Sequence, residues 1–173
     1  MDGRPYLVEI GRQLKSIGLE AVLIGNAAAA LQGAPVTTVD FDFMFRKTPR
    51  NLRKLKTLAT ALGATVMRPY YPASDLYRVV RDDGLQLDFM PTIHGVRSFE
   101  GLRDRGQTID VGGTTIRVAS LRDIIRSKKA AKRLRPERGA GGKRRAAAPP
   151  SESERWVGPR EHRKYPRDLA AGR

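Results

Sequence analysis

Apolar residues recur along the first 135 positions with spacings that alternate between helix and strand. The spacing over residues 6–17 marks one apolar face of a first helix, which ends at Gly18. The apolar run 21–24 is too short for a helix and predicts a buried strand. After Gly25 and Asn26, residues 27–32 predict a second helix, because strong helix formers are followed by a glycine and a proline. The chain therefore opens as helix, strand, tight turn and helix.

Two later strands carry acids opposite an apolar face. In the predicted strand 36–45, three phenylalanines at 41, 43 and 45 alternate with Asp40 and Asp42. In the predicted strand 85–90, Asp88 alternates with the apolar residues at 85, 87 and 89. Each strand is thus expected to turn its apolar side to the core and its acids to the other face.

The remaining elements follow from turns and caps. Thr48 and Pro49 open a helix that Gly63 closes, and the turn 82–84 joins a strand 77–80 to the strand 85–90. Strands 107–111 and 114–118 form a hairpin, and a capping box at Ser120 and Asp123 opens a helix over 121–134. These elements predict an α/β or α+β fold over residues 1–135.

Length and charge distribution divide the chain at about residue 135. A chain of 173 residues is long enough for one ordinary core, so we expect one catalytic module with appendages. The formal net charge is +15, and from Lys128 onward fifteen Lys and Arg stand against five Asp and Glu. Residues 136–173 are therefore expected to form a basic, irregular, disordered tail, either simply solvated or able to hold RNA phosphates.

The composition also excludes some chemistry. There is no cysteine, so disulfides, thiolate metal sites and a cysteine nucleophile are excluded, and oxygen or histidine ligands remain. No signal-peptide pattern opens the sequence, and no apolar run approaches the roughly 20 residues of a membrane span. We expect a cytoplasmic protein without a membrane partner.

The acids on the two strands form the candidate chemical site. Asp40 and Asp42 project from the same face of one strand and can share hard cations. If the two acidic strands are neighbours, Asp88 joins them on that face, and three carboxylates could hold two divalent ions. The upstream turn at Gly25 and Asn26 offers backbone N–H groups suited to phosphate. Together these features predict metal-assisted phosphoryl transfer.

These motifs also resemble a known superfamily. The segment Leu23-Ile24-Gly25-Asn26, followed by a helix, then Thr37-Thr38-Val39-Asp40-Phe41-Asp42, and later Leu87-Asp88-Phe89, is similar to the nucleotidyltransferases related to DNA polymerase beta. The similarity is greatest to small bacterial stand-alone members, including those like the AbiEii toxins of toxin-antitoxin systems. It covers about residues 7–133, and Asn26 departs from the glycine or serine usual at its position.

The resemblance implies a mixed sheet flanked by helices, and roles for six residues. Asp40, Asp42 and Asp88 would bind two Mg²⁺ ions, which Mn²⁺ could replace, and Asp88 would help to activate the acceptor hydroxyl. Gly25, Asn26 and Lys128 would contact the nucleotide. The implied reaction transfers a nucleoside monophosphate from a nucleoside triphosphate such as ATP to a hydroxyl, with release of pyrophosphate.

Several alternatives stay open at this point. The acceptor could be an RNA end, a protein hydroxyl or a small molecule, and an antitoxin partner is conceivable. Lys128 could equally be a solvated helical lysine near a helix C-terminus. Tyr70 and Tyr71 are interpreted as core aromatics rather than as a stacking surface, and His94 receives no role. The chain could also be a non-catalytic nucleotide- or RNA-binding module, or an inactive member of the superfamily.

Overall fold

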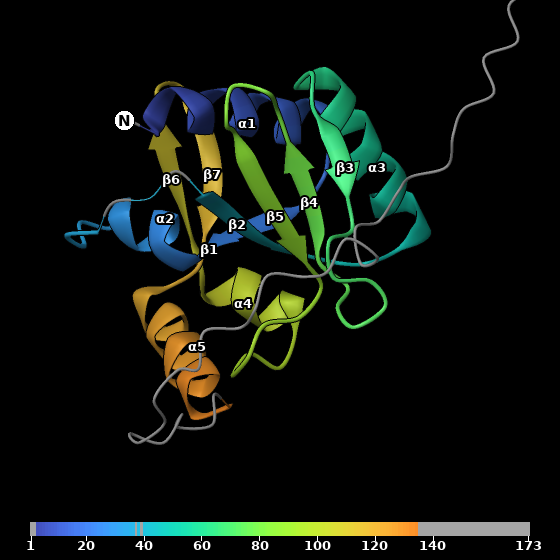
Figure 1. Cartoon of the computed structure of the whole chain (residues 1–173). Helices are drawn as coiled ribbons and strands as arrows, with labels where there is room; N and C mark the ends of the chain where they lie inside the picture. Colours follow the sequence, from blue (N-terminus) through green and yellow to red (C-terminus); the bar gives the residue numbers. More distant parts are fainter. Residues whose placement is uncertain (1–2, 37, 39, 135–173) are drawn as a thin grey trace, which may run out of the picture. The chain divides into compact units, whose positions relative to one another are not determined.

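A computed structural model describes residues 3–36, 38 and 40–134, and these form a mixed α/β structure (Figure 1). The predicted boundary at residue 135 and the predicted tail, residues 136–173, lie outside the described residues. The helices and strands are, in chain order, α1 (Arg4–Ile17), β1 (Ala21–Ile24), α2 (Gly25–Ala30), β2 (Asp40–Phe45), α3 (Pro49–Ala61), β3 (Thr65–Met67), β4 (Tyr77–Val80), β5 (Gln86–Met90), α4 (Phe99–Arg105), β6 (Gln107–Val111), β7 (Thr114–Val118) and α5 (Leu121–Leu134).

The strands make one mixed sheet, which confirms the predicted fold class. The order is β3-β4-β5-β2-β1-β7-β6. β2 pairs with β5, and β1 with β7, in parallel, while the other neighbours are antiparallel. The two acidic strands, β2 and β5, are therefore direct neighbours at the centre of the sheet.

The phenylalanines of β2 form the middle of the core. Phe41, Phe43 and Phe45 are buried, and the ring of Phe43 stacks on that of Phe89 with 5.1 Å between the centroids. Phe45 meets Phe89 edge to face at 5.8 Å. Aromatic pairs in these geometries add stability beyond the area that they bury. This packing fixes which face of β2 turns inward, and so places Asp40 and Asp42 on the other face.

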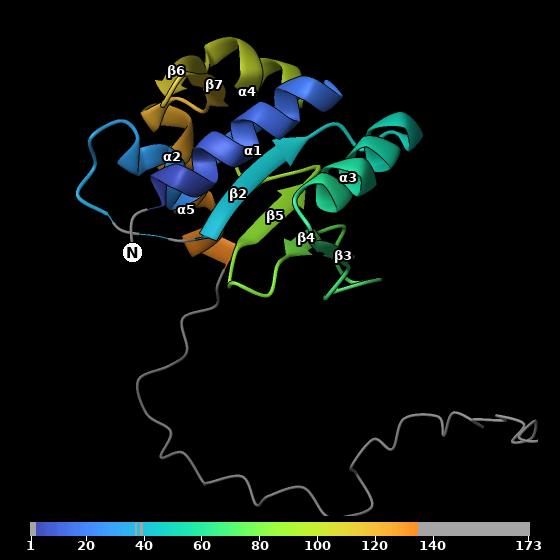
Figure 2. The same ribbon diagram turned by 90° about the horizontal axis from the view of Figure 1, so that it is seen from above.

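Helices α1 and α3 lie side by side against the sheet (Figures 1 and 2). α1 buries Leu7, Ile10 and Leu14, which follow the helical spacing seen in the sequence. It ends at Gly18, whose φ of 64° is the left-handed conformation in which glycine terminates helices. α4 and α5 lie beyond the lower ends of the strands in Figure 1.

The structure corrects four details of the sequence prediction. The second helix begins at Gly25 and ends at Ala30, and the strand predicted over 36–45 begins only at Asp40. β3 and α4 were not predicted, because each is too short to show a clear period. Tyr70 and Tyr71 are 54% and 63% exposed, so their interpretation as core residues is wrong.

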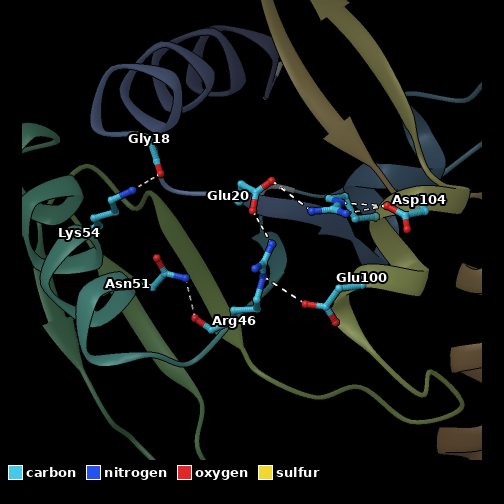
Figure 3. A network of polar contacts seen from close by, with 8 residues as sticks. Gly18, Glu20, Arg46, Asn51, Lys54, Glu100 and Asp104 are labelled. Carbon is cyan, nitrogen blue, oxygen red and sulfur yellow. Dashed lines mark hydrogen bonds and ion pairs between the residues drawn. The ribbon is translucent and has the colours of Figure 1, made fainter.

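Charged residues hold the segment directly after Phe45, at the end of β2 opposite Asp40 (Figure 3). Arg46 forms ion pairs with Glu20 at 2.6 Å and with Glu100 at 3.2 Å. Its backbone carbonyl accepts a hydrogen bond from the Asn51 side chain at 2.9 Å. The guanidinium also lies over the ring of Phe99, 5.1 Å from its centre. Arg46 thus ties the segment after β2 to the start of β1, to α3 and to α4.

None of the helices in the described part of the chain combines the length and the apolarity that crossing a membrane requires.

Candidate active site

The site lies on a row of residues that crosses four neighbouring strands. Ile24 of β1 pairs with Asp42 of β2, Asp42 pairs with Asp88 of β5, and Asp88 pairs with Arg78 of β4. Residues paired in this way project from the same face of a sheet with their side chains close together. The predicted neighbourhood of Asp42 and Asp88 is confirmed, and the row also contains an arginine that the sequence analysis did not single out.

Gly25 approaches the carboxylate of Asp42 more closely than any other residue type could. A Cβ atom at position 25 would collide with Oδ2 of Asp42. Gly25 also has a φ of 69°, in the left-handed region that side chains disfavour. The glycine therefore allows the first turn of α2 to pass directly beside the acid.

Asp42 is in an environment that opposes its ionisation. Burial, and then the neighbouring charges of Asp88 and Asp40, raise the pKa of Asp42 from 3.8 to about 6, while Arg78 lowers it. Desolvation and like charges both penalise a carboxylate. Such a perturbed acid in a cleft is typical of functional sites, because structural acids are normally neutralised.

Asp88 is instead neutralised by Arg78. Nε of Arg78 donates to Oδ1 of Asp88 at 2.8 Å, and Nη2 donates to Oδ2 at 2.7 Å. The Asp88 side chain is 11% exposed, and that of Arg78 is 24% exposed. Two parallel bonds between a guanidinium and a carboxylate form one of the stronger polar contacts in proteins. Arg78 could have been found in the sequence, because it alternates with Tyr77 and Val79 and so faces the same way as Asp88.

A cavity of about 740 Å³ opens beside Asp42. It is lined by Ile24 and Gly25, by the segments 73–76 and 90–94, and by residues of α5. His94 lies in its wall, although the sequence analysis gave it no role. A cavity of this volume can accept a ligand the size of a nucleotide. Asp42 lines it, so a ligand in the cavity meets this carboxylate.

Lys128, which lines the cavity, forms a hydrogen bond with Asn26. Nζ of Lys128 donates to Oδ1 of Asn26 at 2.5 Å, although the two residues are 102 positions apart. Lys128 also lines the cavity, together with Ile124 and Ser127 of the same helix. The structure therefore brings together Gly25, Asn26 and Lys128, the three residues predicted to contact a nucleotide. Their roles stay a prediction.

The position of α5 depends on a buried acid at its start. Asp123 is 1% exposed, and its backbone N–H donates to Oγ of Ser120 at 3.2 Å, as the predicted capping box requires. The Asp123 carboxylate accepts two bonds of 3.0 Å from Arg105 and one of 2.8 Å from Ser120. Burial opposes ionisation, but these bonds lower the pKa of Asp123 below its usual value. The contact fixes α5, and with it Lys128, to α4.

On the acidic face of the sheet, the pair Asp40 and Asp42 is suited to bind a divalent cation. Asp40 and Asp42 lie on the same face of β2, and their repulsion is among the causes that raise the pKa of Asp42. A cation with oxygen ligands would relieve this repulsion. Within residues 3–36, 38 and 40–134, no group of three or more His, Asp or Glu side chains is arranged to hold a metal ion. The donor set thus fits a cation at Asp40 and Asp42, while Arg78 holds Asp88.

A family model described as "Nucleotidyl transferase of unknown function (DUF2204)" matches residues 4–138. The chain belongs to this nucleotidyltransferase family. The match covers all the described helices and strands, including both acidic strands and α5. It also confirms the resemblance that the motifs at Gly25, Asp40, Asp42 and Asp88 suggested. No curated protein matches the sequence.

Solved structures of other nucleotidyltransferases share the fold of this family member. A candidate nucleotidyltransferase of Thermotoga maritima is 20% identical, with a TM-score of 0.58 over 75% of this chain and 84% of that one. The antibiotic-resistance factor ANT(2'')-Ia in solution is 18% identical, with a TM-score of 0.55 over 77% and 74%. Its crystal structure with adenylyl-2''-tobramycin is also 18% identical, with a TM-score of 0.52 over 70% and 71%. At these identities the likeness concerns the fold.

Proposed function

We propose that this nucleotidyltransferase moves a nucleoside monophosphate from a nucleoside triphosphate to a hydroxyl acceptor, with Mg²⁺ bound at Asp40 and Asp42. One observation carries the proposal. The desolvated carboxylate of Asp42 lies between Gly25 and Asp88 and lines a cavity that Lys128 also lines. An acid with this environment and a cation across the cavity are suited to a ligand that brings both metal and phosphate.

In the proposed reaction, the acceptor oxygen forms a bond to the α-phosphorus, and the bond from that phosphorus to the oxygen leading to the β-phosphate breaks. Pyrophosphate leaves, and the acceptor proton passes to a carboxylate or to water. Bound Mg²⁺, or Mn²⁺ in its place, supplies positive charge where the phosphate oxygens gain negative charge.

The residues of the chain have separate proposed tasks. Asp40 and Asp42 hold the cation, and Gly25 leaves room for the Asp42 carboxylate beside the turn. Lys128 lines the cavity and is proposed to attract the triphosphate, and its bond to Asn26 restrains its amine. Asp88 is the third acid on the face, and its proposed role is that of a further ligand or base.

The exposed surface of α5 favours an acceptor that carries negative charge. α5 borders the cavity, and six of its residues are exposed cations: Arg122, Arg126, Lys128, Lys129, Lys132 and Arg133. The adenylylated ligand of ANT(2'')-Ia is tobramycin, whose amines make it cationic at neutral pH. The exposed cations of α5, of which Lys128 lines the cavity itself, repel such a molecule and attract the phosphates of RNA. We therefore favour an RNA end over an aminoglycoside as the acceptor.

Metal-dependent nucleotide binding tests the proposal. Titration of the full chain with a fluorescent ATP analogue, with Mg²⁺ and with EDTA, should show binding that needs the metal. Asp42→Asn should abolish the metal dependence, whereas Asp83→Asn, in the turn between β4 and β5, should leave it unchanged. Equal binding with Mg²⁺ and with EDTA would favour the non-catalytic alternative.

A further inference from the structure

The row of paired residues across the sheet, called the acid row below, contains Ile24, Asp42, Asp88 and Arg78. Its arginine affects which of the acids a metal ion can use. Across β4, β5 and β2 the order on the row is Arg78, Asp88 and Asp42. Arg78 faces Asp88 on the side away from Asp42, because β5 lies between the two other strands. The guanidinium is bonded to both oxygens of the carboxylate.

The two neighbouring acids consequently differ in charge balance. Asp88 has a partner with full positive charge at 2.7 Å. Among the described residues, no cationic side chain forms a hydrogen bond or ion pair with Asp42, and Asp42 lines the cavity. Asp88 is not among the cavity-lining residues. A cation that enters the cavity therefore meets Asp42 with its charge uncompensated and Asp88 with its charge already matched.

We propose that Arg78 takes the place of a divalent cation at Asp88, so that the nucleotide-free protein binds its metal ion through Asp40 and Asp42 alone. Arg78 is then a positioning residue that keeps Asp88 from the ion until the guanidinium is displaced. This inference rests on the proposed function, because it concerns the metal of that same site.

A second interpretation of the contact has the opposite consequence. Carboxylates that bind metals are commonly hydrogen-bonded by outer residues that orient them, and loss of such a partner weakens metal binding. Each carboxylate oxygen has a further lone pair beyond the one that Arg78 uses. If Arg78 merely orients Asp88 as a ligand, its removal lowers the metal affinity. If Arg78 competes with the metal, its removal raises the affinity.

Mn²⁺ binding without nucleotide distinguishes these interpretations. The dissociation constant is measured by electron paramagnetic resonance of free Mn²⁺ for the wild-type chain, Asp42→Asn, Arg78→Met, Asp88→Asn and the variant that combines Arg78→Met with Asp88→Asn. We expect Arg78→Met to tighten Mn²⁺ binding on the order of tenfold, the typical scale of an outer partner's influence. Asp88→Asn alone should change the affinity less than about twofold, and in the double variant it should cancel the gain from Arg78→Met.

Arg81→Met is the matched control. Arg81 lies directly after β4, and its guanidinium also makes two bonds to one carboxylate, that of Asp83, at 3.1 and 3.0 Å. Its side chain is 19% exposed, close to the exposure of Arg78. Asp83 lies in the turn rather than on the acid row, so Arg81→Met should leave the Mn²⁺ affinity unchanged. Thermal unfolding followed by circular dichroism identifies variants that do not fold, and Arg78→Gln then replaces Arg78→Met.

Two results overturn the inference. One is unchanged or weaker Mn²⁺ binding in Arg78→Met, and the other is a loss in Asp88→Asn as large as that in Asp42→Asn. Failure of the proposed function looks different, because Mn²⁺ would then bind in no variant or would bind equally well to Asp42→Asn. If Asp42→Asn abolishes binding and Arg78→Met does not strengthen it, the inference alone is wrong.

Discussion

Gly25 lies against the carboxylate of Asp42 so closely that a methyl group at position 25 would collide with Oδ2. The first turn of α2 and Asp42 of β2 therefore form one unit, although sixteen residues separate Gly25 from Asp42 in the sequence. If Asp42 binds the metal, the position of its carboxylate oxygens depends on the absence of a side chain at Gly25.

Gly25→Ala should reduce the rate of nucleotide transfer by about 100-fold, because displacing a reacting group by roughly 1 Å has an effect of this size. The left-handed φ of 69° should also cost about 1 kcal/mol of stability. The measurement is the single-turnover transfer rate beside the midpoint of thermal unfolding.

Gly33→Ala is the control for this prediction. Gly33 has a φ of 86°, and a Cβ atom there would meet nothing within 4 Å. It should therefore lose a similar amount of stability and keep its transfer rate. Equal loss of rate in both variants would show that backbone strain, and not the approach to Asp42, causes the effect.

Asp42→Asn should stabilise the metal-free protein at neutral pH. The pKa of Asp42 is raised from 3.8 to about 6, so the folded state holds a proton that the unfolded state has released between these values. Stability is consequently lost as pH rises from about 4 to 6, and the asparagine variant avoids this loss. After allowance for partial solvent screening, we expect a gain of about 1–2 kcal/mol at pH 8 and almost none at pH 4.

The measurement is urea unfolding of both proteins in EDTA at pH 4, 6 and 8. Asp83→Asn provides a contrast of opposite sign, because hydrogen bonds from Arg81 and from the Leu85 backbone lower the pKa of Asp83. Its carboxylate contributes stability above its unfolded pKa, and this contribution is lost as pH falls. A gain in Asp42→Asn that did not grow with pH would contradict the assignment of the shifted acid.

Asp123→Ala should destabilise the protein and also weaken nucleotide binding. The side chain is buried and accepts bonds from Arg105 and Ser120, so its removal leaves the Arg105 guanidinium and the Ser120 hydroxyl without this partner. Because Arg105 is 48% exposed, we expect about 2–3 kcal/mol rather than the full cost of breaking a buried ion pair. Urea unfolding and nucleotide titration check the two effects. Unchanged nucleotide affinity in the folded variant would show that α5 does not need this anchor to place Lys128.

Arg46→Met should lower stability by about 1 kcal/mol and leave nucleotide binding unchanged. Its partners Glu20 and Glu100 have side chains that are 57% and 52% exposed, and exposed ion pairs contribute little each. The network joins several elements, but it lies at the end of β2 away from Asp40 (Figure 3). Thermal unfolding at low and high salt checks the effect, which should shrink as salt screens the pairs. Reduced nucleotide affinity would contradict the separation of this network from the site.

Much of the fold could be predicted because its strands have clear alternation. Phe41 and Phe43 alternate with Asp42, and Leu87 and Phe89 with Asp88, so burial of the aromatic face places both acids on the other face. Neither strand alone shows that the two are neighbours or parallel. Whether two strands are neighbours depends on contacts between distant parts of the sequence. The expectation that these two lie together came from the resemblance to a known superfamily.

The contacts of the site could be predicted less well. The bond between Lys128 and Asn26 joins residues far apart in sequence, and no local period encodes it. Arg78 belongs to no recognisable motif, so the sequence alone does not mark it as a site residue, although the hairpin of β4 and β5 places it opposite Asp88. The short elements β3 and α4 lack a period long enough to separate helix from strand.

The most direct test of the central claim is label transfer from each of the four α-labelled ribonucleoside triphosphates, with Mg²⁺, to total RNA and to total protein. The wild-type chain is compared with a variant that combines Asp40→Ala and Asp42→Ala, whose side chains lie outside the buried apolar core. We predict that label enters the RNA fraction with the wild-type chain and with Mg²⁺, and that the variant folds but transfers none. Equal labelling by the wild type and the folded variant, or no labelling of any acceptor by the wild type, would contradict the account.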